Sequence, residues 1–313
     1  MLRKFFTLFV KIKFMKKIGN QIKYWYRKYI PEIIRIFIRK LIPFWLELRY
    51  FNIQTKNFDS DVQGHGESKK LLQICTELNI SNGYYVDIGA SDGWTSSSTF
   101  PFARSKNFSG LSVELDDKKF KKMQYIYKNF DNAYLSKTKV TPLNILDLLN
   151  EFGVPQNFDI LNLDIDSYDL FVIKKLLESY RPKIISMEIN EKIPPPVYFT
   201  VIYDENHFWN GDHFFGCSLQ AAYEEVSKYD YKLYTVIYNN AIFIPQEINL
   251  EFQDLTVAKF YIDGYVSKSD RKEKFSYNSD IDVLLDMKQE DAIIFLNNLF
   301  KDYRGMYILE SRK

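Results

Sequence analysis

The feature that most constrains the fold is an apolar segment, residues 84–88, that runs directly into a turn containing Gly89 and Gly93. About 20 residues later, a second apolar segment, residues 111–113, ends in Glu114. A strand, a glycine turn, a helix and a second strand ending in an acid are typical of an open α/β sheet, which binds ligands at the carboxyl ends of its strands. The glycines allow positive φ and close backbone approach, and Glu114 can accept hydrogen bonds from both ribose hydroxyls. We therefore expect a nucleoside-bearing cofactor here.

The body of the chain is acidic, which argues against a nucleic-acid-binding protein. The 313 residues are 46% hydrophobic, enough for a sizeable core. Of the 42 Lys and Arg residues, 13 lie within residues 1–50 beside two acids, so the rest of the chain carries 29 basic and 38 acidic residues. A nucleic-acid-binding body would show a basic face. Cys75 and Cys217 form no metal-ligand spacing or disulfide framework, and we interpret them as core thiols in a reducing compartment.

Residues 1–55 form a separate basic zone that predicts amphipathic helices. Between Pro31 and Pro43, apolar residues gather on one half of a helical wheel, whereas Arg35 and Arg39 lie on the other half. Such a helix can lie in an anionic membrane surface, or it can pack on the body or on a partner chain. We recognise no secretion signal and no apolar window long enough to cross a bilayer. The expectation is a cytoplasmic protein, with peripheral membrane attachment through residues 1–50 slightly preferred over packing.

Residues 60–246 alternate between strand-like and helix-like segments, which predicts an α/β domain with a mostly parallel sheet and helices on both faces. The last two strands predict an antiparallel hairpin at the sheet edge, and residues 188–215 a polar insertion. Residues 247–313 form a C-terminal extension with one predicted helix. Strands are expected at residues 84–88, 110–114, 133–136, 158–163, 183–187, 231–237 and 241–244, and helices at residues 68–78, 97–104, 116–129, 143–151, 168–179, 218–228 and 281–300.

Polar side chains follow two more of the predicted strands. Asp164 and Asp166 follow the fourth strand, and Glu188 and Asn190 follow the fifth. The tips of parallel strands converge at one edge of the sheet, in the crevice where ligands bind. Carboxylate and amide oxygens suit Mg²⁺, so Asp164, Glu188 and Asn190 are candidate metal ligands. In the alternative interpretation, Glu188 and Asn190 cap loops through backbone hydrogen bonds.

Several ordered blocks of the chain resemble the S-adenosylmethionine-dependent methyltransferases of the FkbM type. The blocks are residues 87–93 (DIGASDG), 108–114 (FSGLSVE), 158–166 (FDILNLDID), 181–183 (RPK), 187–190 (MEIN) and 215–219 (FGCSL). The resemblance covers about residues 60–245. It implies a class I methyltransferase (Rossmann-like) fold with a seven-stranded sheet whose last strand is antiparallel. The family usually has glycine after the second acid of the fourth strand, where this chain has Ser167.

The resemblance also implies a cofactor, S-adenosylmethionine, and a role for each block. The turn after the first strand would cradle the methionine part of the cofactor; its residues are Asp87, Gly89, Ala90, Ser91, Asp92 and Gly93. Glu114 would hold the ribose, and Asp164 would lie beneath the methyl donor.

Transfer of a methyl group from a sulfonium is an in-line displacement, in which positioning the acceptor supplies much of the catalysis. A hydroxyl acceptor must also lose a proton, which requires a general base or a metal ion. The candidate catalytic residues are Asp164, Asp166, His207 and His213. The two histidines belong to an aromatic insertion, residues 198–215, which could cover the acceptor as a lid. The alternative is that both histidines are ordinary surface residues.

The leading hypothesis is O-methylation of a hydroxyl on a sugar, glycan or glycolipid, by analogy with the family. A second hypothesis is a membrane-associated binding module built on a degenerate methyltransferase fold. A third is a nicotinamide-dependent oxidoreductase, which uses the same strand–glycine turn–acid layout. Asp92 argues against the third, because its carboxylate would repel a pyrophosphate at the helix N-terminus.

Overall fold

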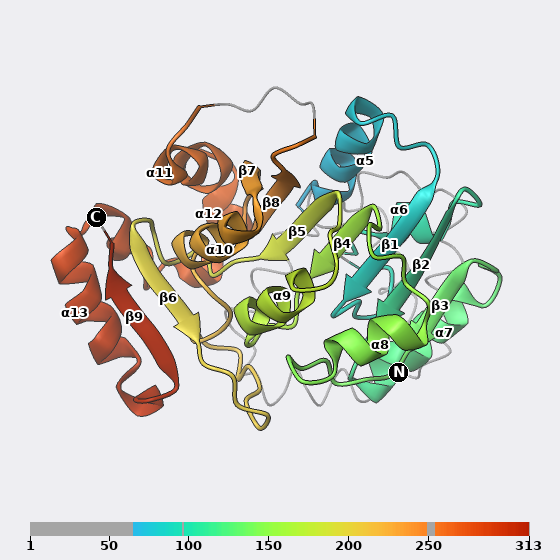
Figure 1. Ribbon diagram of the computed structural model, residues 1–313. Helices are drawn as coiled ribbons and strands as arrows, with labels where there is room; N and C mark the ends of the chain where they lie inside the picture. The colour runs from blue at the N-terminus through green and yellow to red at the C-terminus, as the bar shows by residue number, and fades with distance from the viewer. Residues whose placement is uncertain (1–64, 96, 249–253, 313) are drawn as a thin grey trace, which may run out of the picture. The chain divides into compact units, whose positions relative to one another are not determined.

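A seven-stranded sheet in the order β3-β2-β1-β4-β5-β8-β7 forms the centre of the computed structural model, which describes residues 65–95, 97–248 and 254–312 (Figure 1). β1 to β5 are parallel to one another, and β8 runs antiparallel to both β5 and β7. The strands are β1 (Gly83–Ile88), β2 (Phe108–Val113), β3 (Ala133–Ser136), β4 (Ile160–Leu163), β5 (Ile184–Glu188), β7 (Tyr231–Ile237) and β8 (Asn240–Pro245). The predicted mostly parallel sheet with a reversed last strand is confirmed.

Helices pack on both faces of this sheet. The face toward the viewer in Figure 1 carries α8, α9 and α10, whose Leu149, Ile173 and Ala222 join Val86 and Leu161 of the strands in one buried core. Helix bounds are α5 (Glu67–Glu77), α6 (Phe100–Ala103), α7 (Asp117–Tyr127), α8 (Ile145–Glu151), α9 (Asp169–Leu177) and α10 (Leu219–Val226). This is the layered arrangement that the alternation of the sequence predicts.

Local capping sets where two of these helices begin. Asp116 accepts hydrogen bonds from the backbone N–H groups of Lys118 and Lys119, both at 2.9 Å, and so caps α7 as expected. α8 begins at Ile145, two residues later than expected. The turn before it is held by Thr141 Oγ1, which accepts a hydrogen bond from the backbone N–H of Leu143 (3.3 Å), and by Asn144 Oδ1, which accepts one from the backbone N–H of Thr141 (2.8 Å).

A second, two-stranded sheet joins β6 (Val197–Val201) to β9 (Tyr307–Ser311) in antiparallel register. Phe199 of β6 packs with Phe214, Leu296 and Phe300 in a core of its own. Residues 198–215, expected as a polar insertion and a lid, therefore begin with a buried strand. The C-terminal segment supplies the partner strand. β9 pairs with β6 although more than a hundred residues separate the two strands in the chain.

The single helix expected at residues 281–300 is wrong. Residues Asp282–Asp286 form a 3₁₀ helix (η6), and α13 covers Gln289–Leu299. Between them, Met287 and Lys288 have extended backbone, with ψ of 147° and 153°. The segment also contains α11 (Val257–Tyr261), a π-helical turn η4 (Ile262–Val266), α12 (Arg271–Lys274), η5 (Ser276–Asn278) and η7 (Lys301–Tyr303).

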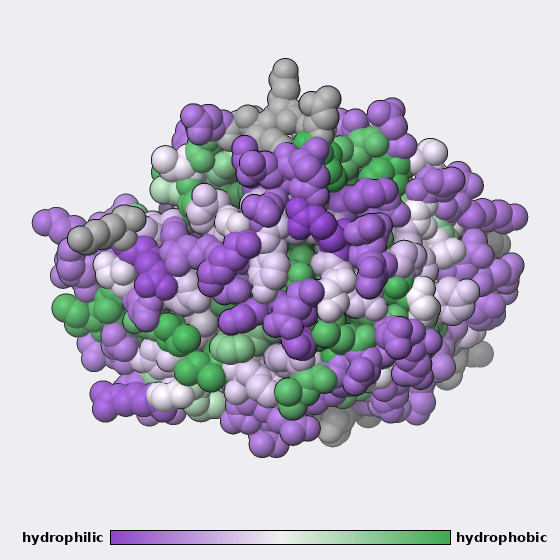
Figure 2. Space-filling view, in the orientation of Figure 1, coloured by the Kyte–Doolittle hydropathy of each residue, from purple (hydrophilic) through white to green (hydrophobic). Residues whose placement is uncertain are grey.

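The part of the chain that the structure describes offers no span for a bilayer: none of its helices has the required length and apolar character. The face seen in Figure 2 is mostly hydrophilic, with apolar residues scattered singly or in small groups. The basic amphipathic zone at residues 1–55 lies outside the described residues, so attachment to an anionic membrane stays a prediction from the sequence.

Candidate functional site

A cavity of about 750 Å³ lies at the carboxyl ends of β1, β2 and β4. Residues from the β1 turn, the end of β2 and the end of β4 form its inner wall, and the segment after β6 contributes three aromatic rings. The wall includes Asp87, Gly89, Ala90, Ser91, Glu114, Asn162, Asp164, Asp166, Ser167, His207, Phe208 and Trp209. The cavity therefore lies at the edge of the sheet where the sequence predicts the binding crevice.

The turn after β1 allows the tips of β1 and β4 to come into direct contact. Gly89 has φ of +86°, and a Cβ added there would lie 1.6 Å from the carbonyl oxygen of Asp164. No side chain can be accommodated at that distance, so glycine is required by both the dihedral angle and the close approach. Ala90 and Ser91 follow it along the cavity wall.

Asp92 and Gly93 do not line the cavity, although the resemblance placed both on the cofactor. The Asp92 carboxylate accepts hydrogen bonds from the backbone N–H groups of Trp94 (3.1 Å) and Thr95 (2.7 Å) and therefore shapes the turn. A Cβ on Gly93 would lie 2.7 Å from Met123 Cγ, which makes Gly93 a packing position against α7. Both residues therefore stabilise the turn without lining the cavity.

Two carboxylates with fixed positions face the cavity from β1 and β2. Asp87 accepts hydrogen bonds from Thr99 Oγ1 (2.5 Å) and Asn162 Nδ2 (2.9 Å), and burial raises its pKa to about 6. Glu114 is 7% exposed and accepts hydrogen bonds from the backbone N–H groups of Ser91 (2.8 Å) and Asp116 (2.6 Å). Each carboxylate oxygen can accept a second hydrogen bond, so Glu114 can still bind a ligand.

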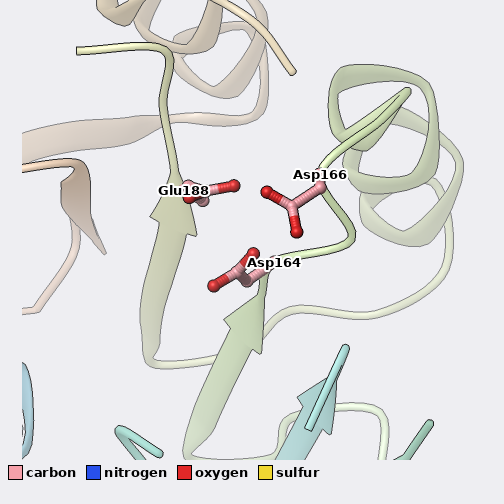
Figure 3. A group of neighbouring side chains, drawn as sticks. All are labelled: Asp164, Asp166 and Glu188. Atoms are coloured by element: carbon pink, nitrogen blue, oxygen red, sulfur yellow. The ribbon is translucent and has the colours of Figure 1, made fainter. Parts of the chain in front are cut away.

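Three further carboxyl groups meet at the tips of β4 and β5. Figure 3 shows Asp164, Asp166 and Glu188 turned toward one another, and one oxygen of each lies within 4.8 Å of the other two. Burial, and then the repulsion of the neighbouring acids, raise the pKa of Asp164 and of Glu188 well above the usual values. Among the described residues, Glu188 Oε1 accepts a hydrogen bond from Asn239 (2.9 Å), whereas its buried Oε2 has no partner.

Asn190, a predicted metal ligand, uses its amide nitrogen to hold the backbone, whereas its buried Oδ1 has no partner among the described residues. Its Nδ2 donates hydrogen bonds to the carbonyl oxygens of His213 (2.9 Å) and Phe215 (3.0 Å) and so holds the end of the insertion. Asp166 is the third carboxyl group of the cluster: the chain turns at Asp166 with φ of +55°, and one of its oxygens lies within 4.8 Å of Asp164 and Glu188.

His207 lies in the cavity wall and His213 does not. His207 is 6% exposed, and its Nδ1 lies 2.6 Å from Ser167 Oγ. Burial lowers the pKa of His207, which favours the neutral ring at pH 7. His213 instead places Nε2 3.1 Å from Asp280, outside the cavity lining. The structure therefore places His207 at the cavity and His213 away from its lining.

The segment that carries His207 is attached to the body at three points. Tyr203 packs edge-on against Tyr168 with ring centroids 4.9 Å apart, and Lys139 contacts both the carbonyl oxygen of Glu205 and the ring of Phe208. Phe208 and Trp209 remain 55% and 42% exposed at the cavity. Their exposed rings form an apolar part of the cavity wall.

The sequence analysis assigned no role to four wall residues: Asn162, Ser167, Phe208 and Trp209. Asn162 was the easiest to find, because it is the one polar residue within β4. It lies beside Asp87, and its buried Oδ1 has no partner among the described residues. The other three depend on where the insertion folds, which no local pattern reports.

The sequence matches no family model and no curated protein. Among solved structures, it is similar to the CurJ carbon methyltransferase (10% identity, TM-score 0.40, covering 59% of this chain and 54% of that one). It is also similar to an S-adenosylmethionine-dependent methyltransferase from Clostridium acetobutylicum ATCC 824 (10%, 0.38, 64% and 99%). A third is an O-methyltransferase family protein from Burkholderia thailandensis (10%, 0.37, 59% and 57%).

The chain thus spans little more than half the length of two of these proteins, and likenesses of this size carry no conclusion about activity. The fold is assigned from the strand order and from the antiparallel orientation of β8. The fold is that of the class I methyltransferases.

Proposed function

We propose that this chain is an S-adenosylmethionine-dependent methyltransferase that methylates a hydroxyl group of an uncharged or cationic small molecule, a sugar or glycan being the preferred class. One observation carries the proposal. A single cavity at the strand tips brings together the two fixed carboxylates Asp87 and Glu114 and the buried histidine His207. The motif blocks shared with the FkbM-type enzymes support the same assignment.

The charge of the cavity wall fits this cofactor. Among the described residues, the wall contains seven acids (Glu67, Asp87, Glu114, Asp116, Asp117, Asp164 and Asp166) against Lys119 and Lys139. S-adenosylmethionine carries a sulfonium, an ammonium group and a carboxylate, which give a net charge of +1, together with a ribose diol and no phosphate. The acids can accept from the diol and attract the two cationic groups, whereas they would repel a dinucleotide pyrophosphate. The wall therefore favours methyl transfer over the nicotinamide alternative.

In the proposed reaction, S-adenosylmethionine supplies an electrophilic methyl group when bound. Glu114 holds the ribose hydroxyls, and Asp87 and Asn162 complete the inner wall. As the oxygen–methyl bond forms, the sulfonium–methyl bond would break and S-adenosylhomocysteine would leave. Neutral His207 would take the proton of the acceptor hydroxyl in this step, and the resulting imidazolium would return that proton to solvent. The exposed rings of Phe208 and Trp209 support the acceptor beside it.

A divalent cation is a second way to activate the acceptor. Asp164, Asp166 and Glu188 are hard oxygen ligands, and the unpartnered Glu188 Oε2 would gain a partner from a cation such as Mg²⁺. The bound ion would lower the pKa of an acceptor hydroxyl. Burial raises the pKa values of these acids, mutual repulsion adds to this effect at Asp164 and Glu188, and a bound cation would favour the ionised forms of all three.

The cofactor assignment predicts that Glu114→Gln weakens S-adenosylmethionine binding by about 100-fold, because two hydrogen bonds to a charged group are impaired. Isothermal titration calorimetry measures this. Glu151→Gln, which changes an exposed acid of α8, is the matched control and should bind as the unaltered protein does. Binding of NAD in place of S-adenosylmethionine would support the oxidoreductase. Cofactor binding without methyl transfer to any acceptor tested would support the binding module.

The acidic wall also predicts the charge of the acceptor. We expect transfer of labelled methyl groups to neutral glycosides to exceed transfer to the same glycosides bearing a phosphate by about 10- to 100-fold, since like charges brought together at a buried surface cost several kcal/mol. Measurements at low and high salt separate this electrostatic effect from shape. A preference for the phosphorylated member of each pair would contradict the acceptor class proposed here.

A further inference from the structure

Ser167 and His207 form a buried hydrogen bond between two segments that are 40 residues apart in the chain. Ser167 Oγ lies 2.6 Å from His207 Nδ1, the two residues are 5% and 6% exposed, and both line the cavity.

Each partner is held independently of the contact. The carboxylate of Asp169 accepts hydrogen bonds from the backbone N–H groups of Ile165 and Ser167, both at 2.9 Å, and thereby fixes the turn before α9. The backbone N–H of His207 donates to the carbonyl oxygen of Asp204 (3.0 Å), and its ring packs edge-on against Phe214 with centroids 5.7 Å apart. The hydrogen bond therefore joins two preformed pieces of structure and orients the imidazole between them.

The two ring nitrogens of His207 have different surroundings. Nδ1 is occupied by Ser167, whereas Nε2 makes no hydrogen bond to any residue in the described part of the chain. The hydrogen bond at one ring nitrogen decides which of the two carries the proton of the neutral ring. A general base needs its lone pair on the nitrogen that meets the substrate.

We propose that Ser167 is the positioning residue for His207: Nδ1–H donates to Ser167 Oγ, which leaves Nε2 unprotonated and able to accept the proton of the acceptor hydroxyl. The tautomer is inferred from the contact between Ser167 and His207. That the proton comes from an acceptor hydroxyl rests on the proposed function. The Ser167 hydroxyl can in turn donate its own hydrogen to a ligand oxygen in the cavity. With the opposite tautomer, Nε2 would be a donor and His207 could not serve as a base.

The tautomer can be measured without turnover, because the whole chain contains only three histidines: His65, His207 and His213. Long-range ¹H–¹⁵N spectra of the full chain, labelled with ¹⁵N-histidine, report which nitrogen of each ring is protonated. We expect the Nδ1–H form for His207 in the unaltered protein at pH 8. In Ser167→Ala the Nε2–H form, preferred by histidine side chains in water, should dominate, and Ser167→Thr should restore Nδ1–H. His65 and His213 serve as internal references whose signals stay in place.

A kinetic measurement then separates positioning from a purely structural role. Loss of a residue that orients a functional histidine typically costs 10- to 100-fold, so kcat of Ser167→Ala should fall by about that factor, while the Kd for S-adenosylmethionine stays within about twofold. The pH profile should also change. Burial and Lys139 lower the pKa of His207, whereas Asp204 and Asp212 raise it. Ser167→Ala removes a hydrogen bond from the same ring, so the pKa seen in the profile should shift.

Two results would overturn the inference. One is an Nε2–H ring in the unaltered protein, a result that does not depend on whether Ser167→Ala folds. The other is a Ser167→Ala protein with unchanged tautomer and unchanged kcat. Failure of the proposed function gives a different pattern: the unaltered protein would show the predicted tautomer but no methyl transfer.

Discussion

Replacing His207 by glutamine is expected to lower kcat by about 10²- to 10⁴-fold, the range that general bases contribute, while the Kd for S-adenosylmethionine stays within about twofold. Glutamine keeps a polar side chain of similar length but cannot take the acceptor proton. His207 lies in the cavity wall beside Ser167 and not among the carboxylates that would hold the cofactor. The loss should therefore fall on the chemical step. Rates of labelled methyl transfer at saturating cofactor measure it.

His213→Gln is the matched control, since it makes the same chemical change in the same segment. Its imidazole pairs with Asp280 outside the cavity lining, so kcat should stay within about twofold. The experiment also decides between the two ways of activating the acceptor. If a metal ion on Asp164, Asp166 and Glu188 does so, His207→Gln retains most of its activity, whereas a chelator abolishes the activity of both proteins until Mg²⁺ is restored.

The pH dependence gives a further check on the same variant. Burial lowers the pKa of His207 below its usual 6.5, so the neutral ring that can act as a base predominates above that lowered value. The kcat of the unaltered protein should therefore rise as the pH rises through the lowered pKa and then level off. His207→Gln should lack this rise. A profile that still rises in the same range would assign the titration to another group.

The sheet edge and the inner wall could be predicted because their signals are local. Apolar runs in the sequence predict β1 and β2, and a glycine predicts the turn between β1 and the next helix. An acid directly after the second strand identifies Glu114 as a candidate ligand-binding residue. The position of Asp92 also has a local cause. An aspartate whose carboxylate accepts hydrogen bonds from backbone N–H groups two and three residues later is a common turn former, and Asp92 has this role beside the cavity lining.

The acceptor side could not be predicted, because long-range packing forms it. β6 becomes a strand only when β9 pairs with it, and Phe199 and Phe214 are buried only when the C-terminal segment covers them. That packing fixes the insertion so that His207 meets Ser167 and His213 turns toward Asp280. Two histidines in a polar stretch of sequence carry no sign of which one will be buried.

Replacing Asp87 by asparagine is expected to change stability and cofactor binding in opposite directions. Burial raises the pKa of Asp87 in the folded protein to about 6, above the ordinary 3.8 that applies to the unfolded chain. The raised value means that folding favours the protonated acid. The stability that Asp87 contributes is therefore complete below pH 3.8 and is lost as the pH rises through 6. Asparagine is never ionised and avoids this loss.

At pH 8, we expect the free energy of unfolding of Asp87→Asn without cofactor to exceed that of the unaltered protein by about 1 to 2 kcal/mol. This is the roughly 3 kcal/mol equivalent of the pKa shift less about one hydrogen bond, since asparagine can accept from only one of Thr99 and Asn162 through its single oxygen. The gain should vanish near pH 4. Urea unfolding at the two pH values measures it, with Asp147→Asn on the exposed side of α8 as the control.

The same substitution should weaken S-adenosylmethionine binding by at least about 10-fold, because one negative charge facing a cationic ligand is lost. An acid that destabilises the empty protein and is needed only when the ligand is present marks a binding site, whereas an acid kept for folding behaves in the opposite way. If Asp87→Asn unfolded more easily at both pH values and bound the cofactor unchanged, Asp87 would be a structural residue, and the cofactor would have to be held by the other carboxylates of the wall.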